Sequence, residues 1–269
     1  MLTIGLIMAH ATNNLMNDYV DHVKGVDKDN YTRAEYGPQT LEHGLLTKRE
    51  MWKYMIVTGI LALVPGIYLT WLHGETALIL LGLGAFFVLF YTWPLKYLGL
   101  GEISVMIVWG PLMIGGGYFV ITGNWSWNVF IASLPYAISV TTVLFGKHID
   151  KIVDDRKKHI FTLPVLLGEK KARFTAISLM LLQYVLIVYL VVIRFLSPIL
   201  LIVFLALPRF KTVLKTFKSP KPHEPPPEYP GNWPLWFVSF AFWHNRRFGS
   251  LFVLGLIVTL IIQKILGML

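Results

Sequence analysis

The chain contains no cysteine and few charged residues. Of its 269 residues only 14% are charged, whereas 55% are hydrophobic. Without cysteine it forms no disulfide and carries no thiol nucleophile. A soluble domain has roughly 25% charged residues, so this composition excludes an ordinary soluble protein. It indicates an integral membrane protein.

Long apolar segments without strand-like alternation run through most of the chain. A helix needs ~20 apolar residues to cross the ~30 Å hydrocarbon layer, which predicts about eight spans. They are residues 2–16, 52–72, 76–92, 103–121, 129–145, 174–193, 198–207 and 248–266. The aromatic segment 233–243 is too short to span, and we expect it to lie at the membrane interface. The predicted fold is an all-α integral membrane domain over residues 1–269.

Basic residues outnumber acidic ones, giving a net charge of +9. When the predicted spans are threaded alternately with the loop at 18–51 inside, only Arg194 and Lys264 fall on the opposite side. Such a bias marks the cytoplasmic face of a membrane protein. The charge is therefore explained by topology and contact with anionic lipids rather than by nucleic-acid binding. We expect a multi-pass protein of the plasma membrane.

Two carboxylate clusters stand where apolar segments meet the charged loops of this face. The first is the run Asn17-Asp18-Tyr19-Val20-Asp21, followed by Asp27, and the second contains Asp150 and Asp154. Residues four apart share one face of a helix, so Asn17 pairs with Asp21 and Asp150 with Asp154. Asp155 and Asp29 fall off these faces, and we expect them to be solvated loop carboxylates.

Paired carboxylates and amides suit a hard cation. Magnesium binds oxygen ligands and keeps positions open for water and substrate phosphates. One such pair at a helix end is more often a solvated loop start, but two pairs on one face favour a metal–diphosphate site. The predicted ligands are Asn17, Asp21, Asp150 and Asp154. Alanine at Asp21, Asp150 or Asp154 should then abolish activity, whereas alanine at Asp155 or Asp29 should not.

These motifs resemble those of the UbiA-type intramembrane prenyltransferases. The first run, with Gly25 and Asp27, is similar to the family's first acidic motif. The second cluster, followed by the segment 162–168, is similar to its second motif. Between them, Tyr91-Thr92 and the segment 96–102 resemble the connecting loop of the naphthoate-prenylating, menaquinone-forming branch. The resemblance covers residues 17–193.

The resemblance implies a ring of about eight to nine transmembrane helices around a central cavity, with cytoplasmic cap loops. It also implies Mg²⁺, a polyprenyl diphosphate and an aromatic acceptor, 1,4-dihydroxy-2-naphthoate above all. The diphosphate would contact basic side chains, for which the candidates are Lys96, Lys147, Arg156 and Lys157.

Four further side chains are candidates for catalytic roles. Tyr19 and Tyr91 flank the motifs and are candidates for stabilising an allylic cation, although packing is the commoner role of such aromatics. Asp18 and Asp27 are candidates for the base that removes a proton from the acceptor, and their alternative role is loop solvation.

The sequence departs from the family pattern at two places. Gly146 and Lys147 stand where the family has an asparagine before its second motif. The family also has a helix before the first motif, so we expect the upstream genomic sequence to encode another apolar segment.

A Pro-rich loop at about 208–232 is expected on the cytoplasmic side. A membrane transporter and a non-catalytic lipid- or quinone-binding relative remain the alternative functions.

Overall fold

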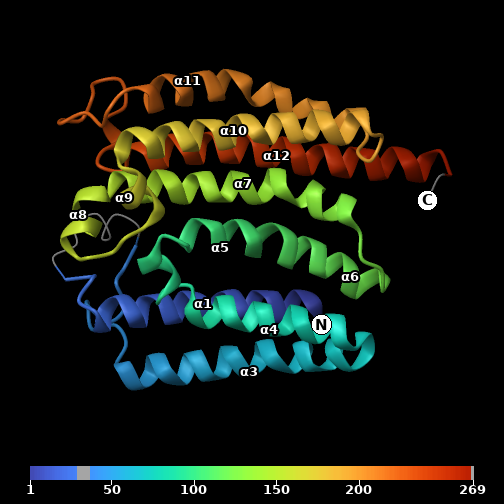
Figure 1. The fold of residues 1–269 in the computed structure, drawn as a ribbon, viewed down its shortest axis with the longest axis horizontal. Helices are drawn as coiled ribbons and strands as arrows, with labels where there is room; N and C mark the ends of the chain where they lie inside the picture. The colour runs from blue at the N-terminus through green and yellow to red at the C-terminus, as the bar shows by residue number, and fades with distance from the viewer. Residues whose placement is uncertain (29–36, 268–269) are drawn as a thin grey trace. The chain divides into compact units, whose positions relative to one another are not determined.

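The structure, a computed structural model, describes residues 1–28 and 37–267 (Figure 1). Within these residues the regular elements are all helices, so the prediction of an all-α fold is confirmed. Contacts between elements divide the chain into two compact units. The first comprises Met1–Ser126 and Val153–Leu163, and the second comprises Trp127–Ile152 and Pro164–Leu269. A single functional domain over both units stays a prediction.

The first unit is built on three long helices and one irregular one. Its elements are α1 (Leu2–Val23), α3 (Lys48–His73), α4 (Glu75–Phe90), η1 (Leu95–Leu98), α5 (Gly101–Ile107), η2 (Val108–Gly115), α6 (Gly116–Thr122) and α8 (Ile152–Lys157). Helix α1 packs against α3 and α4. The Thr12 hydroxyl bonds that of Thr58 on α3 at 2.9 Å, and the Asn13 amide donates to the Val88 carbonyl of α4 at 3.0 Å. These bonds fix α1 relative to α3 and α4, and so fix the position of its C-terminal part, which carries Asp18 and Asp21.

The second unit packs its helices around an aromatic core. Its elements are α7 (Trp127–Asp150), α9 (Leu163–Leu167), α10 (Glu169–Val192), η3 (Pro198–Ala206), α11 (Leu207–Lys218), η4 (Pro230–Asn232) and α12 (Trp236–Ile265). Helix α7 contacts both α10 and α12. The buried Tyr184 hydroxyl lies 2.9 Å from Nε2 of His244, which joins α10 to α12.

Within the described residues, five helices are long and apolar enough to cross a membrane. They are Lys48–His73, Gly101–Thr122, Trp127–Asp150, Glu169–Val192 and Trp236–Ile265, and Glu75–Phe90 is a shorter apolar helix. The predicted span at 198–207 is instead a 3₁₀-helix, η3, that continues into α11. The chain is that of a multi-pass membrane protein.

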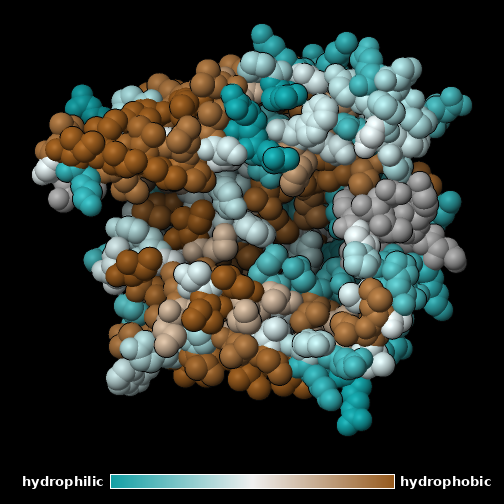
Figure 2. Space-filling model, turned by 180° about the vertical axis from the view of Figure 1, so that it is seen from behind, coloured by the Kyte–Doolittle hydropathy of each residue, from teal (hydrophilic) through white to brown (hydrophobic). Residues whose placement is uncertain are grey.

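The aromatic segment 233–243 is not a separate interfacial element. From Trp236 onward it forms the first part of the continuous helix α12. The reason is packing within the second unit. Phe237 and Phe240 are fully buried, and His244 is hydrogen-bonded to Tyr184, so these contacts hold the segment in the same helix as the residues that follow. In the second unit, Figure 2 shows apolar residues around the C-terminal part of α12 and polar residues around α11 and the loop that follows it.

Candidate functional site

An ion pair lies near the end of α1 in the first unit. The Lys96 ammonium lies 3.0 and 2.9 Å from the two carboxylate oxygens of Asp21. Asp21 is only 4% exposed, so the pair is largely shielded from water. Lys96 comes from η1, the short helix that follows α4. The sequence predicted phosphate binding for Lys96, and in the structure this side chain holds Asp21.

Asn17 lies one helical turn before Asp21. Both residues belong to α1, so their predicted position on one helix face is confirmed. The Thr92 hydroxyl donates to Oδ1 of Asn17 at 3.3 Å. Tyr91, the residue before Thr92, is half-buried, and desolvation of its phenol, the charge of Glu102 and then that of Asp21 raise the pKa of that phenol. Tyr91 is therefore a neutral aromatic ring at physiological pH.

Two further buried carboxylates lie close to Tyr97. Asp27 is 6% exposed and Asp155 is 3% exposed. Burial raises the pKa of the Tyr97 phenol above its ordinary value, and the charges of Asp21, Asp155 and Asp27 raise it further. Charges act on a phenol in this way from nearby, so all three carboxylates lie within electrostatic range of Tyr97. We refer to Asp21, Asp27 and Asp155 as the acidic cluster.

The expectation that Asp155 is a solvated loop carboxylate is wrong. It rested on one continuous helix through Asp150 and Asp154, but α7 ends at Asp150 and α8 begins at Ile152. Ile152 is buried, and Asp155, three residues further on, shares its inward face. Asp154 is half-buried beside it. Asp29 lies outside the described residues.

Asp150 belongs to the second unit and has backbone partners there. Its two carboxylate oxygens each accept an N–H bond of 3.0 Å, from Phe237 and Val238 in the first turn of α12. The Lys221 ammonium lies 3.6 Å from one of them and stands over the Trp233 ring at 5.0 Å. Asp150 therefore acts as an N-terminal cap for α12. Its role as a metal ligand stays a prediction.

Gly146 explains one departure from the expected family pattern. A Cβ at this position would lie 2.8 Å from backbone atoms of Phe237 and Val238, closer than real contacts allow. Helix α7 therefore meets the start of α12 backbone to backbone, and a larger residue is excluded. This close approach also brings Asp150, one turn later, to the N–H groups that it caps. Lys147, the other departure, is half-buried on α7.

The remaining predicted side chains lie around the end of α1 and on α8. Asp18 is half-buried, and the Tyr19 ring packs edge-on against Trp52 with centroids 5.3 Å apart. This contact gives Tyr19 a packing role between α1 and α3. Arg156 and Lys157 are exposed at the end of α8.

The donor set of the first unit fits magnesium. All of its candidate ligands are oxygen atoms of buried or half-buried carboxylates and an amide, and a cationic group already lies against Asp21. In the described part of the chain, no three histidine, cysteine or acidic residues lie close enough together to hold a metal by themselves. Magnesium usually binds one or two carboxylates and completes its shell with water and substrate phosphates, so the type of donor atom, oxygen, suits it.

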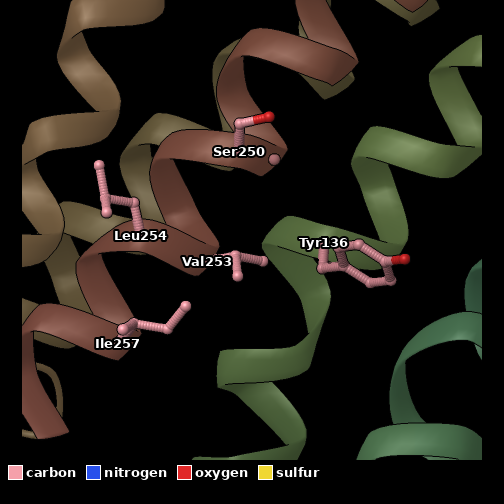
Figure 3. Close-up of a pocket in the computed structure, with 6 residues that line it drawn as sticks. Tyr136, Ser250, Val253, Leu254 and Ile257 are labelled. Carbon is pink, nitrogen blue, oxygen red and sulfur yellow. The ribbon is translucent and has the colours of Figure 1, made fainter.

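A separate, open apolar pocket of about 480 Å³ lies at the surface of the second unit. Figure 3 shows its lining side chains on two neighbouring helices, with Tyr136 on α7 and the others on α12. The residues of α12 are Gly249, Ser250, Val253, Leu254 and Ile257. Two hydroxyl groups, of Tyr136 and Ser250, interrupt an otherwise hydrocarbon wall.

The chain matches the UbiA prenyltransferase family over residues 1–229. It is 32% identical over 183 residues to 1,4-dihydroxy-2-naphthoate octaprenyltransferase of Escherichia coli (strain K12), covering 64% of this chain and 58% of that protein. It is 29% identical over 174 residues to 2-carboxy-1,4-naphthoquinone phytyltransferase of Synechocystis, covering 62% of this chain and 54% of that protein. The chain thus spans little more than half the length of these two relatives.

Two further similarities cover more of the chain. A 1,4-dihydroxy-2-naphthoate octaprenyltransferase of Bacillus subtilis (strain 168) is 28% identical over 253 residues, which is 91% of this chain and 76% of that protein. The apo structure of a UbiA homolog from Aeropyrum pernix K1 superposes with a TM-score of 0.65 at 18% identity, covering 96% of this chain and 88% of the other. At that identity the superposition supports the fold alone.

Proposed function

Since the chain belongs to the UbiA prenyltransferase family, we propose that it transfers a polyprenyl group from a polyprenyl diphosphate to an aromatic acceptor. The relatives named for naphthoate substrates favour 1,4-dihydroxy-2-naphthoate as that acceptor, and hence a step in menaquinone biosynthesis. The observation that carries the proposal is the acidic cluster with its Lys96 partner, held at the end of an apolar helix. A buried anionic site paired with a lysine suits the joint binding of a cation and a diphosphate.

The site's oxygen donors are the groups that would hold Mg²⁺. Asn17, Asp21 and Asp155 would hold it in the first unit, and Asp154 and Asp150 are likewise only proposed ligands. Bound magnesium would neutralise the diphosphate and make it a better leaving group. Lys96 would donate charge-assisted hydrogen bonds to the same anion, as Arg156, Lys157 and Lys147 are also proposed to do.

The transfer then needs a dry site for an allylic cation. The C–O bond breaks with its electron pair on the diphosphate, and the acceptor ring forms the new C–C bond and loses a proton. Tyr91 is half-buried and neutral, so its ring face is proposed to stabilise the cation, by up to about 2 kcal/mol when desolvated. Asp27 and Asp18 are the proposed bases.

Orientation and location follow from the charge pattern. The acidic cluster is proposed to open toward the cytoplasm, because the basic loops around it follow the positive-inside rule. The protein would act in the plasma membrane, with the helices forming the ring expected of the family.

Asp155→Asn is expected to lower prenyl transfer as strongly as changes at the first motif, by at least about 30-fold. The buried carboxylate contributes negative charge to the cluster, and asparagine keeps its shape while removing that charge. Initial rates at saturating substrate measure the effect. Glu224→Gln, an exposed carboxylate in the Pro-rich loop, is the matched control and should keep its activity. Near-normal turnover in Asp155→Asn would remove Asp155 from the site.

An assay of membranes containing the overexpressed protein tests the proposal. Several prenyl diphosphates are offered with 1,4-dihydroxy-2-naphthoate, and products are identified by mass. The expected result is a prenylated naphthoate that forms only when the protein and Mg²⁺ are present. Substrate binding without any product would favour a non-catalytic relative, and net movement of an unmodified solute across vesicles would favour a transporter.

A further inference from the structure

Lys158 lies in a rigid turn that directly follows α8. The turn is closed by three backbone bonds, of which the shortest runs from the Ile160 N–H to the Asp155 carbonyl at 2.8 Å. His159 adopts a left-handed conformation with φ of 55°, and Ile160 is fully buried. The buried isoleucine and the closed turn hold the backbone of Lys158 in one place. Its side chain therefore starts from a fixed point next to Asp155.

The loop after α1 folds back toward Asp21. Gly25 takes a positive φ of 67°, and the Val26 N–H then donates to the Asp21 carbonyl at 2.8 Å. Val26 and Asp27 are both buried, with 4% and 6% exposure. Asp27 thus joins the acidic cluster only because the chain reverses at this point.

Lys158 reaches across to this loop. Its ammonium donates to the carbonyl of Val26 and, at 2.7 Å, to the carbonyl of Lys28. These two groups lie immediately before and after Asp27, so one side chain restrains the backbone on both sides of it. A lysine has three donors and no acceptor, and bonds from a charged donor are stronger than neutral ones. The loop carrying Asp27 and the helix carrying Asp155 are therefore tied together.

We propose that Lys158 is a positioning residue that holds Asp27 beside Asp155 and so sets the affinity of the acidic cluster for a divalent cation. The role of that cation in catalysis rests on the proposed function, but the restraint on the loop does not. Lys158 acts through the backbone of residues 26–28 and not by touching the substrate. A lysine that bound diphosphate directly would leave this loop unchanged when it was replaced.

The test compares Lys158→Met, which keeps the length but removes the charge and the donors, with Lys158→Arg, which keeps both. Lys170→Met is the control, since Lys170 is exposed at the start of α10. Purified proteins are examined without any prenyl substrate. Hydrogen exchange reports on the amides of residues 25–28, and electron paramagnetic resonance titrates Mn²⁺ as a probe for the divalent cation.

Lys158→Met is expected to exchange these amides about tenfold faster and to bind Mn²⁺ about tenfold more weakly, a change of about 1.4 kcal/mol. Lys158→Arg should recover most of both losses, and Lys170→Met should match the unmodified protein. Unchanged exchange and unchanged Mn²⁺ affinity in Lys158→Met would overturn the proposal. If Lys158→Met does not fold, Lys158→Gln, which removes the charge, is measured in the same way, and unchanged exchange and Mn²⁺ affinity in that variant also overturn the proposal. Absence of prenyl transfer in the unmodified protein would contradict the proposed function but not this restraint.

Discussion

Asp21→Asn is expected to lower Mg²⁺-dependent prenyl transfer by at least about 100-fold, or about 2.7 kcal/mol of barrier. Asp21 is the buried carboxylate whose two oxygens both accept hydrogen bonds from Lys96, and its charge acts on the Tyr97 phenol together with those of Asp27 and Asp155. Asparagine keeps the shape but removes the charge that would hold a cation. Rates measured over a range of Mg²⁺ concentrations should stay low even at saturation.

A loss of activity in Asp21→Asn has two possible causes, a loss of folding stability and a loss of metal binding. The side chains of Lys96 and Asp21 are 12% and 5% exposed, so Asp21→Asn leaves a largely buried ammonium without a charged partner. Breaking such a pair costs about 3–5 kcal/mol. The double variant Asp21→Asn/Lys96→Met removes both charges and should regain most of the lost stability in thermal unfolding. If its transfer rate recovered as well, the loss in the single variant would be one of folding, and Asp21 would not be a ligand.

Gly146→Ala is expected to lower the melting temperature by about 5 °C or more. The added methyl group would lie 2.8 Å from the backbone of Phe237 and Val238, and neither can yield as the end of a flexible side chain would. Overpacking of this kind costs about 1–3 kcal/mol, and displacement of α12 would also weaken the two N–H bonds that Asp150 accepts. Thermal unfolding of the purified protein, followed by the loss of monodisperse protein, measures the effect.

Gly82→Ala is the matched control. Gly82 lies inside α4, and a Cβ there meets no atom within 4 Å. Alanine is the better helix former, so this variant should be neutral or slightly stabilising. Gly146→Asn restores the family's residue type close to its usual place and should nevertheless be destabilising. Equal melting temperatures for Gly146→Ala and Gly82→Ala would refute the close contact of α7 with α12.

The sequence predicted those features that depend on one segment of chain. Apolar length predicted the all-α membrane fold, and the four-residue spacing placed Asn17 and Asp21 on one helix. The motif spacing was enough to identify the family. Each of these inferences needs only local periodicity or composition, which tertiary contacts seldom overturn in a long helix.

Features that depend on contacts between segments were missed. The helix breaks between Asp150 and Ile152, and Asp155 therefore points inward with Ile152. In the sequence, the apolar Ile152 three residues before Asp155 was the one sign of this buried face. The capping of α12 by Asp150 is a contact across 87 positions, which no local pattern predicts. The same holds for Lys158, whose partners lie 130 and 132 positions away. A charged side chain in a loop sequence gives no sign of which distant carbonyl it will meet.

Diphosphate release by the purified protein, measured against Mg²⁺ concentration, tests the central claim most directly. Prenyl diphosphates of increasing chain length are supplied with 1,4-dihydroxy-2-naphthoate, and free diphosphate and prenylated product are quantified in the same samples. The account predicts that both appear in equal amounts, that a chelator stops both, and that Asp21→Asn produces neither. Equal product formation with and without a chelator, or unchanged release by Asp21→Asn, would contradict a metal–diphosphate site at the acidic cluster.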